Sequence, residues 1–125
     1  MQGLRRWIGW AAFALALATS SACGSRSLTE LCKDACDEAD AKGCPPEEGV
    51  TRCKENCETN VRRLERLADK ANCNDQLDRA TECADDNFDR AICSDTNPCE
   101  SETNALGSCV VDYCLSHTSD VDCSG

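Results

Sequence analysis

Aromatic side chains are scarce in this sequence. They make up 4% of the residues, and after residue 22 only Phe88 and Tyr113 remain. Proteins that hold single-stranded nucleic acids stack the bases on several aromatic rings. Lys and Arg are also in the minority, with 13 residues against 23 Asp and Glu and a net charge of −10. Since phosphate binding needs clustered positive charge, we expect no nucleic-acid partner.

The groups on which enzymes and metal sites usually depend are missing as well. His117 is the only histidine, and the sequence has no Gly-x-Ser-x-Gly elbow, phosphate-binding loop or dinucleotide fingerprint. No cysteines are spaced Cys-x-x-Cys, which is a frequent spacing in structural zinc sites and the spacing of thioredoxin-like redox sites. We therefore predict that the protein is not an enzyme, with no catalytic residue, no metal site and no cofactor.

Two groups of acidic residues are candidate calcium ligands. Neither follows the EF-hand loop pattern, so we interpret both as solvated helix faces; they are Asp34, Asp37 and Asp40, and Asp85, Asp86 and Asp89. A third charged stretch alternates in sign along one predicted helix. This pattern indicates an exposed, salt-bridged face, made by Arg62, Arg63, Arg66 and Lys70 with Glu58, Glu65 and Asp69.

Residues 1–22 have the pattern of a secretory signal peptide. Two arginines precede an apolar run over residues 7–18, and small residues lead up to Cys23. The same stretch resembles a bacterial lipobox, whose cysteine is lipidated and becomes the new N-terminus. Setting Cys23 aside leaves twelve of the 13 cysteines, enough for six disulfides with no stray thiol. We therefore predict export, and favour lipidation at Cys23 over free secretion.

The rest of the chain has little with which to build a core. Among the 103 residues from Cys23 onward, 14 are Leu, Val, Ile or Phe, and the net charge is −12. Such a composition is typical of disordered proteins. Disulfides offset it, because each contributes about 2–4 kcal/mol, chiefly by restricting the unfolded chain.

Hydrophobic periodicity predicts an all-α fold: a small disulfide-rich bundle of about four helices in two antiparallel hairpins. A tether over residues 23–27 leads to the first hairpin, residues 28–71. The second hairpin and a disulfide-closed tail occupy residues 72–125. Local signals place the helix boundaries. The first helix has a capping box at Ser27 and a stop at Gly43, the second has Pro46 as its first residue, and caps are predicted at Asn74 for the third and at Asn97, before Pro98, for the fourth.

Cysteine spacing predicts how the helices are joined. Cysteines four residues apart lie above each other on one helix face, too far apart for an unstrained bond within the helix. In an antiparallel hairpin the first cysteine therefore pairs with the last, which gives Cys32–Cys57 and Cys36–Cys53. The same reasoning applied to two Cys-x₉-Cys pairs gives Cys73–Cys109 and Cys83–Cys99. The others are assigned by position, as Cys44–Cys93 between the hairpin tips and Cys114–Cys123 at the C-terminus.

Twelve cysteines allow about ten thousand pairings, and the sequence alone does not choose among them. The twin Cys-x₃-Cys and Cys-x₉-Cys spacings resemble those of small mitochondrial intermembrane-space chaperones and coiled-coil-helix proteins, and the shorter pattern resembles plant α-hairpinins. The chain also resembles cysteine-rich putative lipoproteins of Gram-negative bacteria. These resemblances imply a helical-hairpin fold and no particular activity.

The function expected from these observations is non-catalytic. We predict an exported, lipid-anchored protein of the cell envelope, at the outer membrane or the periplasmic face, with a structural or protein-binding role. The membrane is the expected partner through the lipid, and the protein partner is unknown. A secreted effector, such as a protease inhibitor or toxin, and a periplasmic chaperone are the alternatives. A chaperone needs an exposed apolar groove, and so few apolar residues make one unexpected.

Because the disulfides replace a core, reduction is expected to unfold the protein. Its far-UV circular dichroism spectrum should lose the helical signal when a reductant is added at 25 °C and neutral pH. A spectrum that stays helical in reductant would contradict this dependence.

Overall fold

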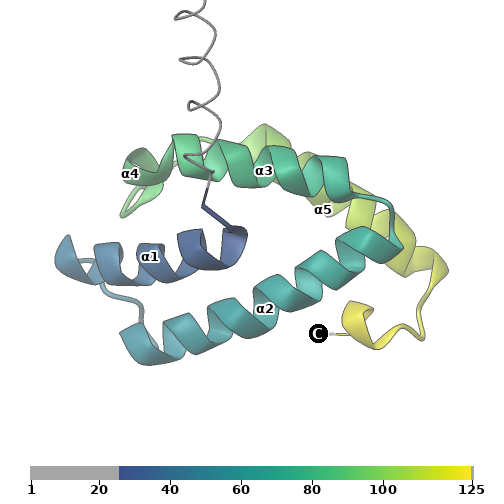
Figure 1. The fold of residues 1–125 in the computed structure, drawn as a ribbon, viewed down its shortest axis with the longest axis horizontal. Coiled ribbons are helices and arrows are strands. Elements are labelled where there is room, and N and C mark those ends of the chain that lie inside the picture. Colours follow the sequence, from purple (N-terminus) through teal and green to yellow (C-terminus); the bar gives the residue numbers. More distant parts are fainter. Residues whose placement is uncertain (1–25, 125) are drawn as a thin grey trace, which may run out of the picture.

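The computed structural model describes residues 26–124, which form helices and no β-strand (Figure 1). The prediction of a small all-α, disulfide-rich bundle is confirmed. The predicted signal peptide and Cys23 lie outside the described residues. The elements are α1 (Leu28–Ala41), α2 (Val50–Lys70), α3 (Asn74–Asp86), α4 (Phe88–Ala91), α5 (Glu100–Ser116) and the 3₁₀ turn η1 (Val121–Cys123).

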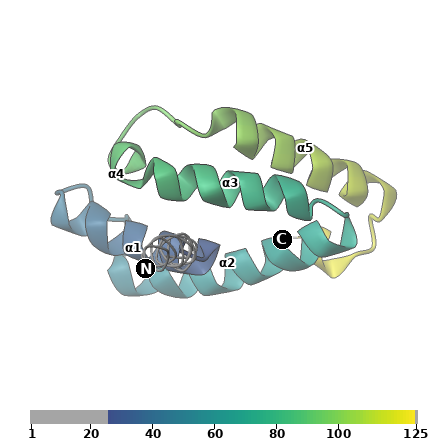
Figure 2. The same cartoon turned by 45° about the horizontal axis from the view of Figure 1, so that its top comes forward.

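The four long helices pair as two hairpins. Helix α1 packs on α2, and α3 packs on α5, with the short α4 at the turn between them. Figure 2 shows α3 and α5 running side by side above the α1–α2 pair. In Figure 1, α1 lies between α2 and α3, and the C-terminal turn η1 folds back against α2. None of the helices within residues 26–124 is both long and apolar enough to cross a membrane.

Helix α1 has the boundaries that its sequence signals predict. The Ser27 hydroxyl accepts a hydrogen bond from the backbone N–H of Glu30, and the Glu30 carboxylate accepts one from the backbone N–H of Ser27, which completes the capping box. At the other end Gly43 adopts a φ of +83°, which favours glycine. The backbone N–H of Cys44 then bonds to the Ala39 carbonyl, as in a Schellman motif.

The predicted start of α2 was wrong. The helix begins at Val50, not at Pro46, because Gly49 stands before it with a φ of +85°. The backbone N–H of Gly49 bonds back to the Pro46 carbonyl at 3.0 Å and closes a separate turn. The left-handed glycine interrupts the helical path, so Pro46 lies in a turn that precedes the helix.

The predicted caps of the last two long helices were also displaced. Asn74 is the first residue of α3 and Cys73 its cap, and α5 is capped by Cys99 instead of Asn97. Asn97 still contributes a bond, since its side-chain oxygen accepts from the backbone N–H of Cys99 at 2.9 Å. At both helix starts a disulfide-bonded cysteine occupies the N-cap position, and the side chain of the nearby asparagine makes a hydrogen bond in the preceding turn.

Six disulfides hold the helices together. Four are the pairs expected from the cysteine spacing, and the other two are the pairs assigned by position. Their Cα–Cα distances run from 5.5 to 6.1 Å, close to the usual separation for a disulfide. Two join α1 to α2, two join the α3 and α5 hairpin, one joins the hairpin tips and one closes the tail: Cys32–Cys57, Cys36–Cys53, Cys73–Cys109, Cys83–Cys99, Cys44–Cys93 and Cys114–Cys123.

The buried interior is small and consists partly of sulfur. Among the nine buried apolar residues of the described chain, four are cysteines: Cys36, Cys57, Cys73 and Cys99. One cluster, built on Ala68, Cys73 and Leu106, lies where α2 meets the second hairpin. The hairpins are thus joined at both ends, by this cluster and by the Cys44–Cys93 bond between their tips.

Candidate functional site

An apolar cleft lies between the two hairpins. Its volume is about 350 Å³, and its walls come from α1, α2, α3, α4, α5 and the loop before α5. We refer to it as the interhairpin cleft. It is lined by Leu28, Leu31, Cys32, Ala35, Leu64, Leu77, Ala80, Ala84, Phe88, Ala91, Ile92, Asn97, Pro98, Cys99, Thr103 and Leu106.

The cleft remains unfilled because of the residues on its walls and the bonds around it. Four alanines line it, at positions 35, 80, 84 and 91, and their side chains are too short to reach across. Helices usually approach until their side chains interdigitate. Here Cys32–Cys57 and Cys83–Cys99 link the helices within each hairpin, and the Cys44–Cys93 bond, next to Ile92 of the wall, joins one hairpin to the other.

The lining favours binding over chemistry. Within residues 26–124 no ionisable side chain lines the cleft, since both cysteines of its wall are in disulfides. Asn97 and Thr103 are its polar side chains. An apolar pocket with a few polar groups is typical of small-molecule sites, whose volumes run from about 300 to 1,000 Å³.

The cleft corrects an expectation drawn from composition. So few apolar residues made an accessible apolar groove unexpected, yet Leu28, Leu77, Ala84 and Phe88 face one. The apolar side chains of α3 at positions 77, 80 and 84 all line the cleft. Composition counts the apolar residues but does not indicate whether they meet.

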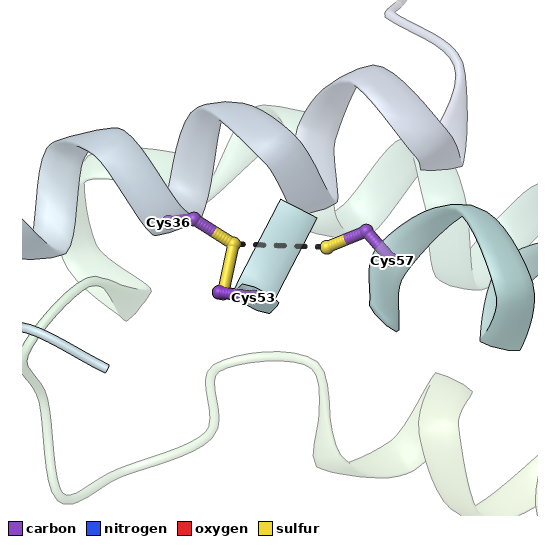
Figure 3. Close-up of side chains that lie close together, drawn as sticks. All are labelled: Cys36, Cys53 and Cys57. Carbon is purple, nitrogen blue, oxygen red and sulfur yellow. Dashed lines mark hydrogen bonds between the residues drawn. A yellow bond between two sulfur atoms is a disulfide. The ribbon is translucent and has the colours of Figure 1, made fainter. Parts of the chain in front are cut away.

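The cysteines of the first hairpin form a second cluster. Cys36 and Cys53 are bonded, and the sulfur of Cys57 lies 3.7 Å from that of Cys36 (Figure 3). These sulfur atoms lie within 4.8 Å of one another, close enough to share a metal ion. Metal binding to cysteine requires thiolates, and all three sulfurs are in disulfides. In its oxidised form the cluster is therefore a structural joint.

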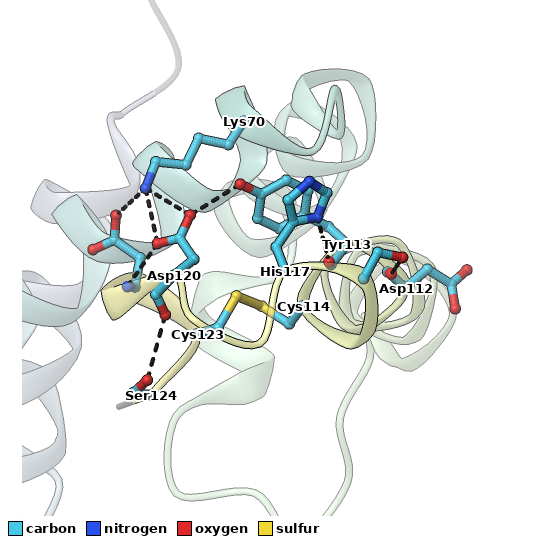
Figure 4. The surroundings of a disulfide bond; sticks show 10 residues. Lys70, Asp112, Tyr113, Cys114, His117, Asp120, Cys123 and Ser124 are labelled. Carbon is cyan, nitrogen blue, oxygen red and sulfur yellow. Dashed lines mark hydrogen bonds and ion pairs between the residues drawn. A yellow bond between two sulfur atoms is a disulfide. The ribbon is translucent and has the colours of Figure 1, made fainter.

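A third cluster gathers polar groups at the C-terminal tail (Figure 4). Lys70 of α2 bonds to both Asp120 and Asp122, each at 2.9 Å, and Arg66 bonds to Asp122 at 2.6 Å. The hydroxyl of Tyr113 donates to Asp120 at 2.9 Å. We refer to these five residues as the tail clamp. With the Cys114–Cys123 disulfide, they hold η1 against α2.

The only histidine in the sequence lies beside the tail clamp. The ring of His117 stacks on that of Tyr113, with 4.1 Å between centroids, and its Nδ1 contacts the Tyr113 carbonyl at 2.9 Å. His117 is the C-cap residue of α5. No serine or cysteine of the described chain forms a hydrogen bond with its ring.

Ion pairing shifts the titration of the tail clamp. Hydrogen bonds from Arg66 hold the pKa of Asp122 far below that of an ordinary aspartate, and its side chain is only 8% exposed. Lys70 lowers the pKa of Asp120, and the two aspartates raise the pKa of Lys70 in turn. The hydrogen bond to Asp120 raises the pKa of Tyr113. All four shifts favour the paired state.

The ion pairs expected from the sequence differ from those in the structure. Arg66 and Lys70 bond to aspartates about 50 residues away, whereas their helical spacing suggested partners within α2. Asp34 and Asp85, assigned to solvated faces, both bond to Arg26, at 3.1 and 2.8 Å. The alternation of sign was visible in the sequence, but the tertiary partner was not.

Arg26, which pairs with Asp34 and Asp85, also contacts the wall of the cleft. Its guanidinium lies over the ring of Phe88, 4.3 Å from the centroid, a distance at which a cation is attracted to an aromatic face. Phe88 belongs to the wall of the cleft and also to a shallow groove that contains Arg26, Asp85, Asp86 and Asp89. One face of the cleft wall therefore borders the start of the described chain.

No protein-family model, curated protein or solved structure matches this chain. The resemblances drawn from cysteine spacing therefore stay expectations. The six disulfides by themselves indicate a small exported protein, because such bonds persist in oxidising, extracytoplasmic compartments.

The tail clamp predicts how stability depends on pH. Since the pKa values of Asp120 and Asp122 are lowered by folding, their stabilising effect is present above pH 4 and is lost as the pH falls below about 4. Asp122→Asn should lower the thermal midpoint at pH 7, and its difference from the wild type should shrink between pH 4 and pH 2. Circular dichroism at each pH measures this.

Asp95→Asn is the matched control, because Asp95 is exposed in the loop before α5. Its thermal midpoint should follow that of the wild type at every pH. A difference between Asp122→Asn and the wild type that stays constant down to pH 2 would show that the ion pairs do not hold the tail.

Proposed function

We propose that this protein is an exported, lipid-anchored, non-catalytic protein of the cell envelope that binds an apolar ligand in its interhairpin cleft. The observation that carries the proposal is the cleft itself: about 350 Å³ of apolar space that the disulfide framework keeps open. Leaving apolar walls unfilled is unfavourable, and a ligand that covers them removes that cost.

The pairing of the cysteines supports the anchor. The six disulfides use all twelve cysteines from Cys32 to Cys123 among themselves. Cys23 is thus left outside the framework, directly after the signal-like segment. An odd cysteine in an exported chain calls for another use, and lipidation at a lipobox supplies one. The location that follows is the outer membrane or the periplasmic face of the envelope.

The lack of reactive groups in the cleft supports a non-catalytic role. General acid–base and nucleophilic catalysis need a titratable or activated side chain within reach of the bound molecule. From residues 26–124 the lining has two polar side chains, the amide of Asn97 and the hydroxyl of Thr103. These groups can orient a ligand by hydrogen bonding.

A chaperone-like role is the second candidate, and the same cleft favours it. A protein of that kind holds an exposed apolar segment of another polypeptide. The two candidates differ in one respect. If the protein is a chaperone, an apolar peptide should displace a small molecule bound in the cleft.

Lipidation is tested by metabolic labelling. When the full chain is produced in a Gram-negative host fed an alkyne-bearing palmitate analogue, the protein should take up label, and Cys23→Ser should lose it. Mass spectrometry of the N-terminal peptide measures both. Label that persists in Cys23→Ser, or its absence from the wild type, would overturn the anchor.

Binding is tested with the uncharged dye N-phenyl-1-naphthylamine, whose fluorescence rises in apolar surroundings. The Cys23→Ser form, which has no cysteine for the lipid, should bind the dye saturably, and Ala84→Trp in the same background should reduce binding at least tenfold because the indole fills the cleft.

Leu115→Ala is the control for the dye, since Leu115 is apolar, 72% exposed and outside the lining. It should bind the dye as the Cys23→Ser form does. Equal binding by Ala84→Trp, with an unchanged far-UV spectrum, would place the dye elsewhere and contradict the role of the cleft.

A further inference from the structure

The described chain begins at the wall of the cleft. Arg26 is held there by three contacts: its ion pairs with Asp85 and Asp34, at 2.8 and 3.1 Å, and its position over the Phe88 ring. Two residues later Leu28, the first residue of α1, lines the cleft. The chain therefore enters the fold beside the apolar space and not on the far side of the molecule.

Cys23 lies within short reach of that wall. It precedes Arg26 by three residues, and three residues span at most about 11 Å even when fully extended. A group attached to the Cys23 sulfur or amine thus begins within about 11 Å of the residue that covers Phe88.

The charges around the cleft wall favour some classes of apolar ligand over others. The shallow groove at Phe88 contains Asp85, Asp86 and Asp89 against Arg26 and Arg90, and Asp34 adds a further negative charge beside Arg26. A free fatty acid, or a phospholipid whose headgroup has a net negative charge, would bring an anion to this surface. The carboxyl group of an acyl chain is consumed when the chain is attached to a protein, so an attached acyl group carries no such charge.

The volume of the cleft matches one hydrocarbon chain. A methylene group takes about as much room as a water molecule, roughly 30 Å³. A space of about 350 Å³ therefore holds on the order of twelve methylene groups. A two-chain lipid with its headgroup would not fit.

We propose that the interhairpin cleft holds an acyl chain of the protein's own lipid anchor, the one carried by Cys23. The protein then has two states: a sheltered state, with one acyl chain inside the cleft, and an inserted state, with that chain in the bilayer. This inference rests on the proposed lipidation of Cys23 and deepens the proposed function by naming the ligand of the cleft.

Photocrosslinking from the anchor tests the inference. The full chain is produced in a Gram-negative host fed a palmitate analogue that carries a diazirine and an alkyne, and intact cells are irradiated. After reduction and trypsin digestion, the lipid should be crosslinked to the fragment 80–90, which contains Ala80, Ala84 and Phe88 of the cleft wall. The fragment 55–62, which contributes nothing to the lining, should carry at least tenfold less crosslink.

A cleft-filling variant separates an internal crosslink from chance contact. Ala84→Trp should move the crosslinks from fragment 80–90 to phospholipid, while Leu115→Ala leaves them in place. Ala80→Leu, a smaller change at the same wall, serves if Ala84→Trp does not accumulate.

The possible outcomes distinguish three claims: the lipid anchor, the sheltered state and the assignment of the acyl chain to the cleft. Label at Cys23 with crosslinks only to phospholipid, to free lipid or to other proteins would overturn the sheltered state and leave the anchor standing. Absence of label at Cys23 would overturn the anchor and this inference together. Crosslinking of fragment 80–90 that Ala84→Trp does not reduce would overturn the assignment to the cleft.

Discussion

The rest of this structure depends on the disulfides that cross from one helix to another. In most helical bundles the separation between helices follows from the side chains that interdigitate. Here Cys32–Cys57 and Cys36–Cys53 set the separation of the first pair, and Cys73–Cys109 and Cys83–Cys99 set that of the second. Because these bonds restrict the unfolded chain, a highly charged sequence with few apolar residues still has a defined fold.

The framework gives the molecule two unlike ends. Where α2 meets the second hairpin, Ala68, Cys73 and Leu106 are buried together, and the tail clamp holds the C-terminal turn on α2 with buried charge. Toward the tips, the Cys44–Cys93 bond joins the hairpins without a comparable packed cluster. The cleft lies between these attachments, and at its edge the Arg26–Asp85 ion pair links the start of α1 to α3.

Much of the fold could be predicted from local sequence, because helical periodicity and cysteine register act over short distances. The capping box at Ser27, the stop at Gly43 and the antiparallel register of the first hairpin are all of this kind. The start of α2 could not be predicted, since it depends on the φ of Gly49. The cleft and the tail clamp also escaped prediction, because each joins residues that only the tertiary structure brings together, such as Leu28 with Leu106, or Lys70 with Asp120.

The four alanines in the wall of the cleft shape the cavity, whereas the disulfides hold the fold. In a bundle held by packing, a larger residue at a helix interface shifts the helices and costs stability. In this protein six disulfides also hold the helices, so larger side chains in place of Ala35, Ala80, Ala84 and Ala91 are expected to fill the cleft at a smaller cost to the fold. A lineage of such chains could change what it accommodates, in size or polarity, while its architecture stays constant.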